Sequence, residues 1–162
     1  MLGDPQRARQ ALTRAECIAS ALPDQPSSGS PWAFPAERLA IFRLSVLLRT
    51  GDPDGALAAA AAADQGWASG DPLIPGTWAQ IRIGAAIANL LKDELDGAAE
   101  QVTPMLAMAP EYRIATVTGW LADLDEHLAH PRFTRDPRAH ALRQQIRDFT
   151  SAALPPTARM AG

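Results

Sequence analysis

Apolar residues recur every three or four positions along most of the chain, the spacing that places side chains on one face of an α-helix. Proline, glycine and acidic residues separate these periodic segments and are typical of helix ends and turns. No segment alternates apolar and polar residues over the length that a half-buried strand needs. The pattern therefore predicts an all-α protein with about seven helices. We expect them over residues 5–22, 36–49, 53–65, 77–92, 95–108, 112–129 and 137–154.

The apolar stripes of these helices predict the core. Its residues are Ala8, Ala11, Leu12, Ala15, Ile18 and Ala19; Leu39, Phe42, Val46 and Leu47; Ile83, Ala86, Ile87, Leu90 and Leu91; Ile114, Val117, Leu121, Leu124 and Leu128; and Ala141, Leu142, Ile146 and Phe149. Pro104 falls inside the fifth helix and should kink or loosen it. We expect loops at 23–35 and 66–76, one helical domain over 1–154, and a tail that frays at 155–162.

Three helix-to-helix corners look alike. They are Gly3-Asp4-Pro5, Gly51-Asp52-Pro53 and Asp93-Glu94-Leu95, and each is followed three residues later by an alanine, at Ala8, Ala56 and Ala98. A turn residue ends one helix, an acidic residue caps the next, and the small residue lets the two helices approach. Such a recurring corner is typical of stacked antiparallel helical hairpins.

These corners, and the small residues after them, resemble the tetratricopeptide repeat (TPR) family. The matching positions are Ala98, Val102, Met105 and Pro110; Ala8, Leu12 and Ala15; Ala56, Ala60 and Ala63; and Ala86. The chain departs from the family in three respects. Leu44 stands where the family has a small residue, the Trp and Tyr of the family's first helix are missing, and the period is longer than 34 residues. The resemblance implies a TPR-like α-solenoid of about three hairpins, with a concave face that binds partners.

Residues 105–154 resemble the C-terminal repeat region of actinobacterial helix-turn-helix transcriptional regulators. The matching features are the segment 106–113, Thr116, Leu121, the pair Leu128-Ala129, the segment 131–133 and the segment 142–149. No DNA-reading helix-turn-helix is recognised, and the chain begins at a corner, as if an array had lost its first helix. The resemblance implies the sensing or protein-contact half of such a regulator. We expect the uncovered edge at 1–22 to be apolar and to allow dimerisation.

Composition narrows the class of protein without naming a ligand. Hydrophobic residues make up 47% and charged residues 20%, which indicates a folded domain. The net charge of −3 disfavours a general nucleic-acid binder. The single cysteine, Cys17, excludes an intramolecular disulfide, and no segment reads as a secretory signal or membrane span. We therefore expect a cytoplasmic protein.

The sequence carries no enzyme signature, and we expect no cofactor and no resident metal. His127 and His130, with Asp123 and Glu126, could ligate zinc, but a polar helix end explains them better. His140 reads as a surface residue, and Cys17 reads as a small buried hydrophobe.

Charge is uneven along the chain. Residues 51–100 hold eight acids against two bases, whereas 131–162 is rich in arginine, with Arg143 and Arg147 on one face of the last helix. This basic segment could contact nucleic acid or an acidic partner. A solvated cap that pairs with the acidic middle of the chain is the better interpretation, because terminal repeats must be polar outside.

We predict a non-enzymatic interaction module, regulatory in role, that binds a peptide, a partner protein or a second copy of itself. The candidate ligand-contacting residues are Arg38, Ser45, Arg49, Trp78, Gln80, Arg82 and Arg113. Arg38 and Arg49 could clamp a carboxylate. The alternative is a small all-α enzyme or small-molecule binder with a pocket between hairpins near Trp78, Arg82 and Arg113.

Overall fold

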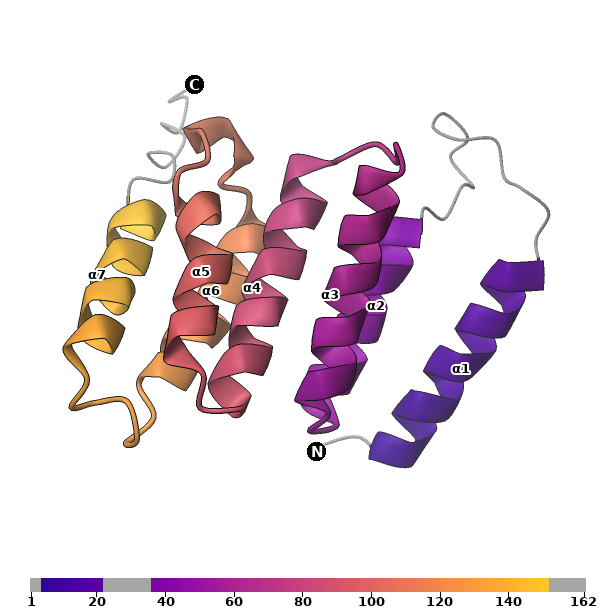
Figure 1. Ribbon diagram of the computed structural model, residues 1–162, viewed down its shortest axis with the longest axis horizontal. Coiled ribbons are helices and arrows are strands. Elements are labelled where there is room, and N and C mark those ends of the chain that lie inside the picture. Colours follow the sequence, from indigo (N-terminus) through magenta and orange to yellow (C-terminus); the bar gives the residue numbers. More distant parts are fainter. Residues whose placement is uncertain (1–3, 22–35, 152–162) are drawn as a thin grey trace, which may run out of the picture. The chain divides into compact units, whose positions relative to one another are not determined.

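The computed structural model describes residues 4–21 and 36–151, and the regular elements in these ranges are all helical. Figure 1 shows the seven α-helices of the described residues, which confirm the all-α prediction. The chain divides into two compact units, Met1–Leu73 and Ile74–Gly162. The predicted loop at 23–35 and the predicted tail at 155–162 lie outside the described residues.

Unit 1 is built on a helical hairpin. Helix α2 (Ala36–Arg49) packs along α3 (Pro53–Ala68), and α1 (Pro5–Ala21) packs against α2. The hairpin core is Leu44 with small side chains of α3, and the shortness of those side chains lets the two helices approach closely. Polar bonds attach α1 to the hairpin: Arg9 donates to the Thr50 hydroxyl and carbonyl, both at 3.2 Å, and Arg43 pairs with Glu16.

Unit 2 has four α-helices that each pack against two others. They are α4 (Pro75–Leu91), α5 (Leu95–Leu106), α6 (Ala115–Leu128) and α7 (Pro137–Ser151), with a short 3₁₀ turn, η1 (Pro110–Tyr112), between α5 and α6. Helix α4 contacts α5 and α6, and α7 contacts the same two helices (Figure 1). Ten residues of α4 are buried, because neighbours cover it on two sides. The interior holds most residues of the predicted stripes of α4, α6 and α7, with Val102 and Met105 of α5.

The second and third predicted corners fold into the same turn. Gly51 and Asp93 both have left-handed backbone, with φ of 72° and 64°. The amide of the next residue then donates to the carbonyl five residues back, from Asp52 to Leu47 and from Glu94 to Asn89, at 2.9 Å in each case. This is the hydrogen bond of the Schellman helix end. The Asp52 side chain caps α3 by accepting a hydrogen bond from the Gly55 amide, whereas the Glu94 side chain makes no cap hydrogen bond on α5, contrary to the prediction. The residue four positions after each of these acids, Ala56 or Ala98, is fully buried.

Replacing Gly51 with alanine should lower the free energy of unfolding by about 1 kcal/mol, because a Cβ is disfavoured at positive φ. The added methyl would meet no heavy atom within 4 Å, so backbone strain is the whole cost. Urea unfolding of the purified chain measures the change. At the equivalent corner, Asp93→Gly is compared with Asp93→Ala. Both variants lack the carboxylate that pairs with Arg132, and the glycine variant should be the more stable of the two by about 1 kcal/mol because it relieves the strain at φ 64°. Equal losses in both variants would contradict this account of the corners.

Several core predictions were wrong. Phe42 is 53% exposed, and Leu44 is buried in its place, because α2 is apolar on most of its sides and periodicity alone cannot choose which side meets α3. Ile114 is the N-cap of α6 and is exposed, because α6 begins at Ala115, three residues later than predicted. Ala141 is also exposed.

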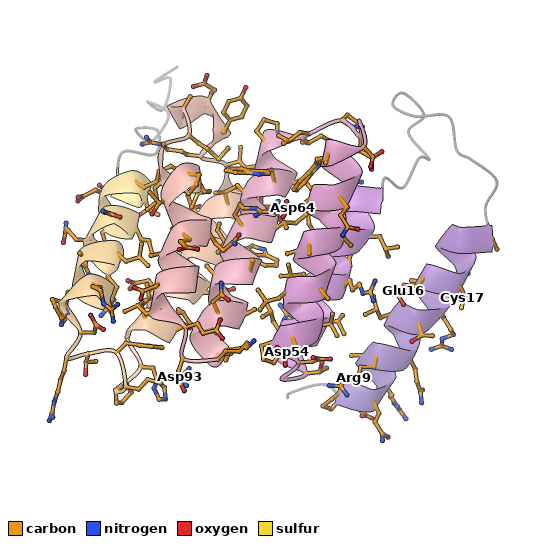
Figure 2. All side chains as sticks on the ribbon, in the orientation of Figure 1. Arg9, Glu16, Cys17, Asp54, Asp64 and Asp93 are labelled. Carbon is orange, nitrogen blue, oxygen red and sulfur yellow. The ribbon has the colours of Figure 1, made fainter. Side chains whose placement is uncertain are left out.

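The N-terminal helix differs from its prediction in two ways. Cys17 is exposed on α1 and not buried (Figure 2). In addition, Ala11, Ala15 and Ile18 were predicted to face the core and are exposed, and Ile18 is the only large hydrophobic residue among the exposed positions of the described part of this helix. The reason is that alanine and cysteine fit an apolar stripe by type while contributing little area to bury.

Helix boundaries are otherwise close to those predicted. The third helix continues through Gly66 to Ala68, so the following loop is shorter than expected, and the fourth helix begins at Pro75. Pro104 lies inside α5, which ends two residues later at Leu106 and not at Met108. Proline removes one backbone donor and weakens the last turn of a helix.

Candidate functional site

Three of the predicted contact residues lie on α2 in unit 1. Arg38 and Arg49 are exposed, and Ser45 is half-buried. Arg49 occupies the last turn of the helix, where the helix dipole favours a cation. A concave face that these residues share with the fourth helix stays a prediction.

The predicted residues on α4 are held by contacts within unit 2. Trp78, Gln80 and Arg82 are all half-buried. The Gln80 side-chain amide donates to the carbonyl of Gly76, one turn back, at 3.1 Å. Arg82 donates from Nη1 to Oε1 of Gln101 on α5, at 2.9 Å, and so links the two helices of the hairpin.

Arg113 lines a surface cavity of about 450 Å³. The walls come from the last turns of two neighbouring helices, with Thr103, Leu106 and Ala107 contributed by α5 or its cap and Gln145, Asp148 and Phe149 by α7. The cavity falls within the range of sizes typical of ligand pockets. Trp78 and Arg82 do not line it, so of the three residues named for the alternative pocket only Arg113 is found there.

The guanidinium of Arg113 is fixed in orientation. Its Cζ lies 4.4 Å from the centre of the Phe149 ring, and Nη1 donates to the Phe149 carbonyl in the last turn of α7 at 3.4 Å. Stacking of an arginine on an aromatic ring is favourable and restricts the plane of the guanidinium. One consequence is structural, because Arg113 places a cation at the C-terminal end of α7, where the helix dipole favours it.

Exposed apolar side chains flank Arg113 in the sequence and lie at the same end of unit 2 as Arg113. Tyr112 is 42% exposed and Ile114 is 47% exposed. Ile74, at the start of α4, is the other exposed large hydrophobic residue in the described part of unit 2. The Ile114 side chain lies over the first turn of α4, since a Cβ on Gly76 would be 3.2 Å from its Cδ1. We call Tyr112, Arg113 and Ile114, together with the cavity, the Arg113 surface.

The sequence predicted Arg113 as a contact residue, but it did not predict most of the residues that line the cavity with it. The periodicity places Thr103 with Leu106 and Ala107 on one face of a helix, and Gln145 with Asp148 and Phe149 on another. It does not show that these two faces meet, which depends on the packing of α5 against α7. One local feature of the sequence does point to this surface. In the run Tyr112-Arg113-Ile114, two large apolar residues flank an arginine just after a proline turn.

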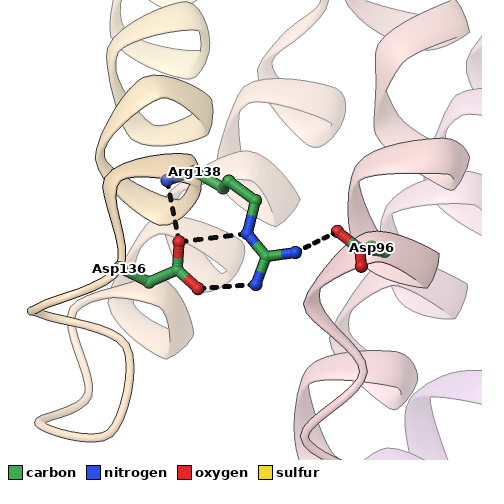
Figure 3. Close-up of polar contacts among 3 residues, drawn as sticks. All are labelled: Asp96, Asp136 and Arg138. Atoms are coloured by element: carbon green, nitrogen blue, oxygen red, sulfur yellow. Dashed lines mark hydrogen bonds and ion pairs between the residues drawn. The ribbon is translucent and has the colours of Figure 1, made fainter.

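The arginine-rich C-terminal segment pairs with acids of its own unit. Arg132 binds Asp93 at 2.7 Å, and Arg143 binds both carboxylate oxygens of Asp125 on α6, at 2.7 and 2.9 Å. Arg138 bridges Asp136 and Asp96 of α5 (Figure 3). Asp93 and Asp96 belong to the acidic middle of the chain, so this part of the structure agrees with the interpretation of the basic segment as an internally paired cap.

Hydrogen bonds from Arg143, opposed by partial burial, hold the pKa of Asp125 below its usual 3.8. A carboxyl group whose pKa is lower in the folded state stabilises the fold above its unfolded pKa and loses that contribution as pH falls through the folded value. Replacing Arg143 with glutamine should therefore cost up to about 1 kcal/mol at pH 7. The same replacement should also make the free energy of unfolding less sensitive to acid below about pH 4.

Urea unfolding at pH 7 and pH 3 measures this difference in sensitivity. The matched control is Arg135→Gln, an exposed arginine in the turn before α7, which should follow the unmodified chain at both values of pH. Lowering the pH from 7 to 3 should reduce the free energy of unfolding less in Arg143→Gln than in the unmodified chain. Equal reductions would show that Asp125 does not titrate in this way.

The histidines have local roles. His127 Nδ1 lies 2.8 Å from the carbonyl of Asp123, one turn back, and His140 is exposed with Nε2 2.8 Å from the carbonyl of Thr134. Within residues 4–21 and 36–151, no three His, Cys, Asp or Glu side chains are grouped as metal ligands would be.

No protein family, curated protein or solved structure matches this chain. None of the helices in the described ranges combines the length and apolar character needed to cross a membrane. A functional interpretation therefore depends on the residues of the Arg113 surface.

Proposed function

We propose that the chain is a non-enzymatic interaction module that binds a peptide or a partner protein through the Arg113 surface. The observation that carries the proposal is the exposure of Tyr112 and Ile114 directly on either side of Arg113, the residue between them that lines the cavity. Tyrosine and arginine are enriched among the residues that dominate protein interfaces, where apolar neighbours exclude water from them. Three of the C-terminal arginines bind acids of the same unit, which leaves direct nucleic-acid binding with less support.

The resemblance to transcriptional regulators supports a regulatory role in the cytoplasm, and the resemblance to tetratricopeptide repeats supports a TPR-like array of hairpins. A second copy of the chain is one of the partners that the proposal allows. Sedimentation of the purified chain over a range of concentrations distinguishes such a homodimer from a hetero-complex.

The test is retention of a partner by two variants of the tagged chain, first from the lysate of cells that produce it and then with the purified partner. Replacing both Tyr112 and Ile114 with alanine should weaken binding of that partner at least tenfold, about 1.4 kcal/mol, because both side chains lose apolar contact area. The matched control is Ile18→Ala, which truncates an exposed apolar residue in unit 1 and should bind as the unmodified chain does. Equal binding by the double variant would refute the proposed surface.

The cavity favours a second candidate, a small-molecule binder, which is the alternative predicted from the sequence. Its volume of about 450 Å³ would hold a compact metabolite, and Arg113 would supply the charge that orients it. A small molecule that remains with the purified chain and is lost on Arg113→Gln would favour this candidate over a protein partner.

A further inference from the structure

The cavity of the Arg113 surface is lined by two opposite charges that do not pair with each other. Arg113, from the segment before α6, and Asp148, from α7, both line it, and no ion pair joins them among the described residues. Asp148 accepts a hydrogen bond from the Gln144 side chain at 2.8 Å, which uses one of its carboxylate oxygens. A carboxylate accepts several hydrogen bonds, so Asp148 retains capacity toward the cavity.

Arg113 also retains donors. A guanidinium has five N–H groups, and the hydrogen bond that the structure gives Arg113 is the long one from Nη1 to Phe149. Nε is shielded from solvent and has no hydrogen-bond partner. An anion can therefore approach only at the Nη end of the group. Stacking on Phe149 holds that end in a fixed plane, which favours a planar anion such as a carboxylate.

The rest of the lining is mainly apolar. Leu106 and Ala107 from the end of α5, with the ring of Phe149, provide the apolar part. A molecule complementary to the whole cavity needs a carboxylate, an N–H group and an apolar side chain close together. These three features occur on a single amino-acid residue that has a free α-carboxylate.

We propose that this cavity binds an α-carboxylate residue with an apolar side chain, its carboxylate on Arg113 and its α-nitrogen donating to Asp148. The chemistry is shared by the C-terminal residue of a peptide and by a free amino acid. The inference rests on the proposed function, since it specifies what the Arg113 surface recognises in its partner. The volume suits one residue, so the remainder of a peptide would lie outside, across Tyr112 and Ile114.

The experiment is calorimetric titration of the full chain with N-acetyl-L-leucine, N-acetyl-L-leucinamide, L-leucine, and the tripeptide Ala-Ala-Leu as free acid and as C-terminal amide. N-acetyl-L-leucine and the tripeptide acid should each bind at least about tenfold more tightly than the corresponding amide, because the amide loses the charge-assisted bonds to Arg113. Tighter binding of the tripeptide acid than of leucine identifies a peptide C-terminus, and the reverse order identifies a free amino acid.

Variants test the assigned roles. Arg113→Gln should weaken binding of N-acetyl-L-leucine about tenfold, whereas Arg135→Gln should leave it unchanged. Asp148→Asn should weaken the binding of L-leucine, which carries an ammonium group, more than the binding of N-acetyl-L-leucine. Ala107→Phe adds a ring to the apolar wall of the cavity without altering Arg113, so it should weaken binding even if Arg113→Gln does not fold.

Equal affinity for acids and amides, or no binding of any acid, would overturn the inference. So would N-acetyl-L-leucine binding that survives both Arg113→Gln and Ala107→Phe. The proposed function has a separate criterion, because it fails only if a partner protein is retained equally after the replacement of Tyr112 and Ile114.

Discussion

Replacing Leu121 with alanine should lower the free energy of unfolding by about 2–5 kcal/mol. Leu121 lies on α6, has no exposed surface, and belongs to the helix that packs against both α4 and α7. The substitution removes buried methyl groups, and the packing of two neighbouring helices limits how far the resulting cavity can collapse. Urea unfolding followed by circular dichroism measures the loss.

The matched control for this prediction is Leu73→Ala. Leu73 is 52% exposed, so the same truncation removes little buried area and should change stability by no more than about 0.5 kcal/mol. Comparable losses in the two variants would mean that α6 is not held in the interior as described.

Replacing Ala98 with leucine should destabilise the chain by about 1–3 kcal/mol. Ala98 is fully buried in the first turn of α5, directly after the corner that joins it to α4. A leucine there must push the two helices apart or adopt a strained rotamer. Because Ala56 holds the same place after the equivalent corner, Ala56→Leu should have a loss in the same range.

Ala141→Leu provides the comparison for both variants, since Ala141 is exposed on α7 and the same added volume meets solvent. Its stability should remain within about 0.5 kcal/mol of the unmodified chain. Thermal unfolding gives the order of the four proteins. A leucine tolerated at 98 but not at 56 would show that the two corners are not equivalent.

The local part of the fold could be predicted from sequence because its causes are local. Asp4 accepts a hydrogen bond from the Gln6 amide, and Asp52 accepts one from the Gly55 amide, as their positions before a proline suggested. The positive φ of Gly51 follows from the absence of a side chain. Asp93 adopts the same conformation, and only its alignment with Gly51 indicated this.

The candidate site depends on packing, which periodicity does not determine. Phe42 and Leu44 are equally apolar, and only the position of α3 decides that Leu44 is buried. In the same way, Arg113 and Asp148 are far apart in sequence and line one cavity only because the segment before α6 lies against the last turns of α7. The ion pairs of Arg132, Arg138 and Arg143 likewise need helices that sequence alone does not place together.

If the chain meets its partner at the Arg113 surface, Tyr112 lies within reach of that partner and Ile18 does not. Site-specific photo-crosslinking measures this, with benzoylphenylalanine placed at Tyr112 in one protein and at Ile18 in another. A purified partner should be crosslinked from position 112 and not from position 18, and Arg113→Gln should reduce the yield. Crosslinking from position 18 alone, or equal yields from both positions, would contradict this placement of the partner.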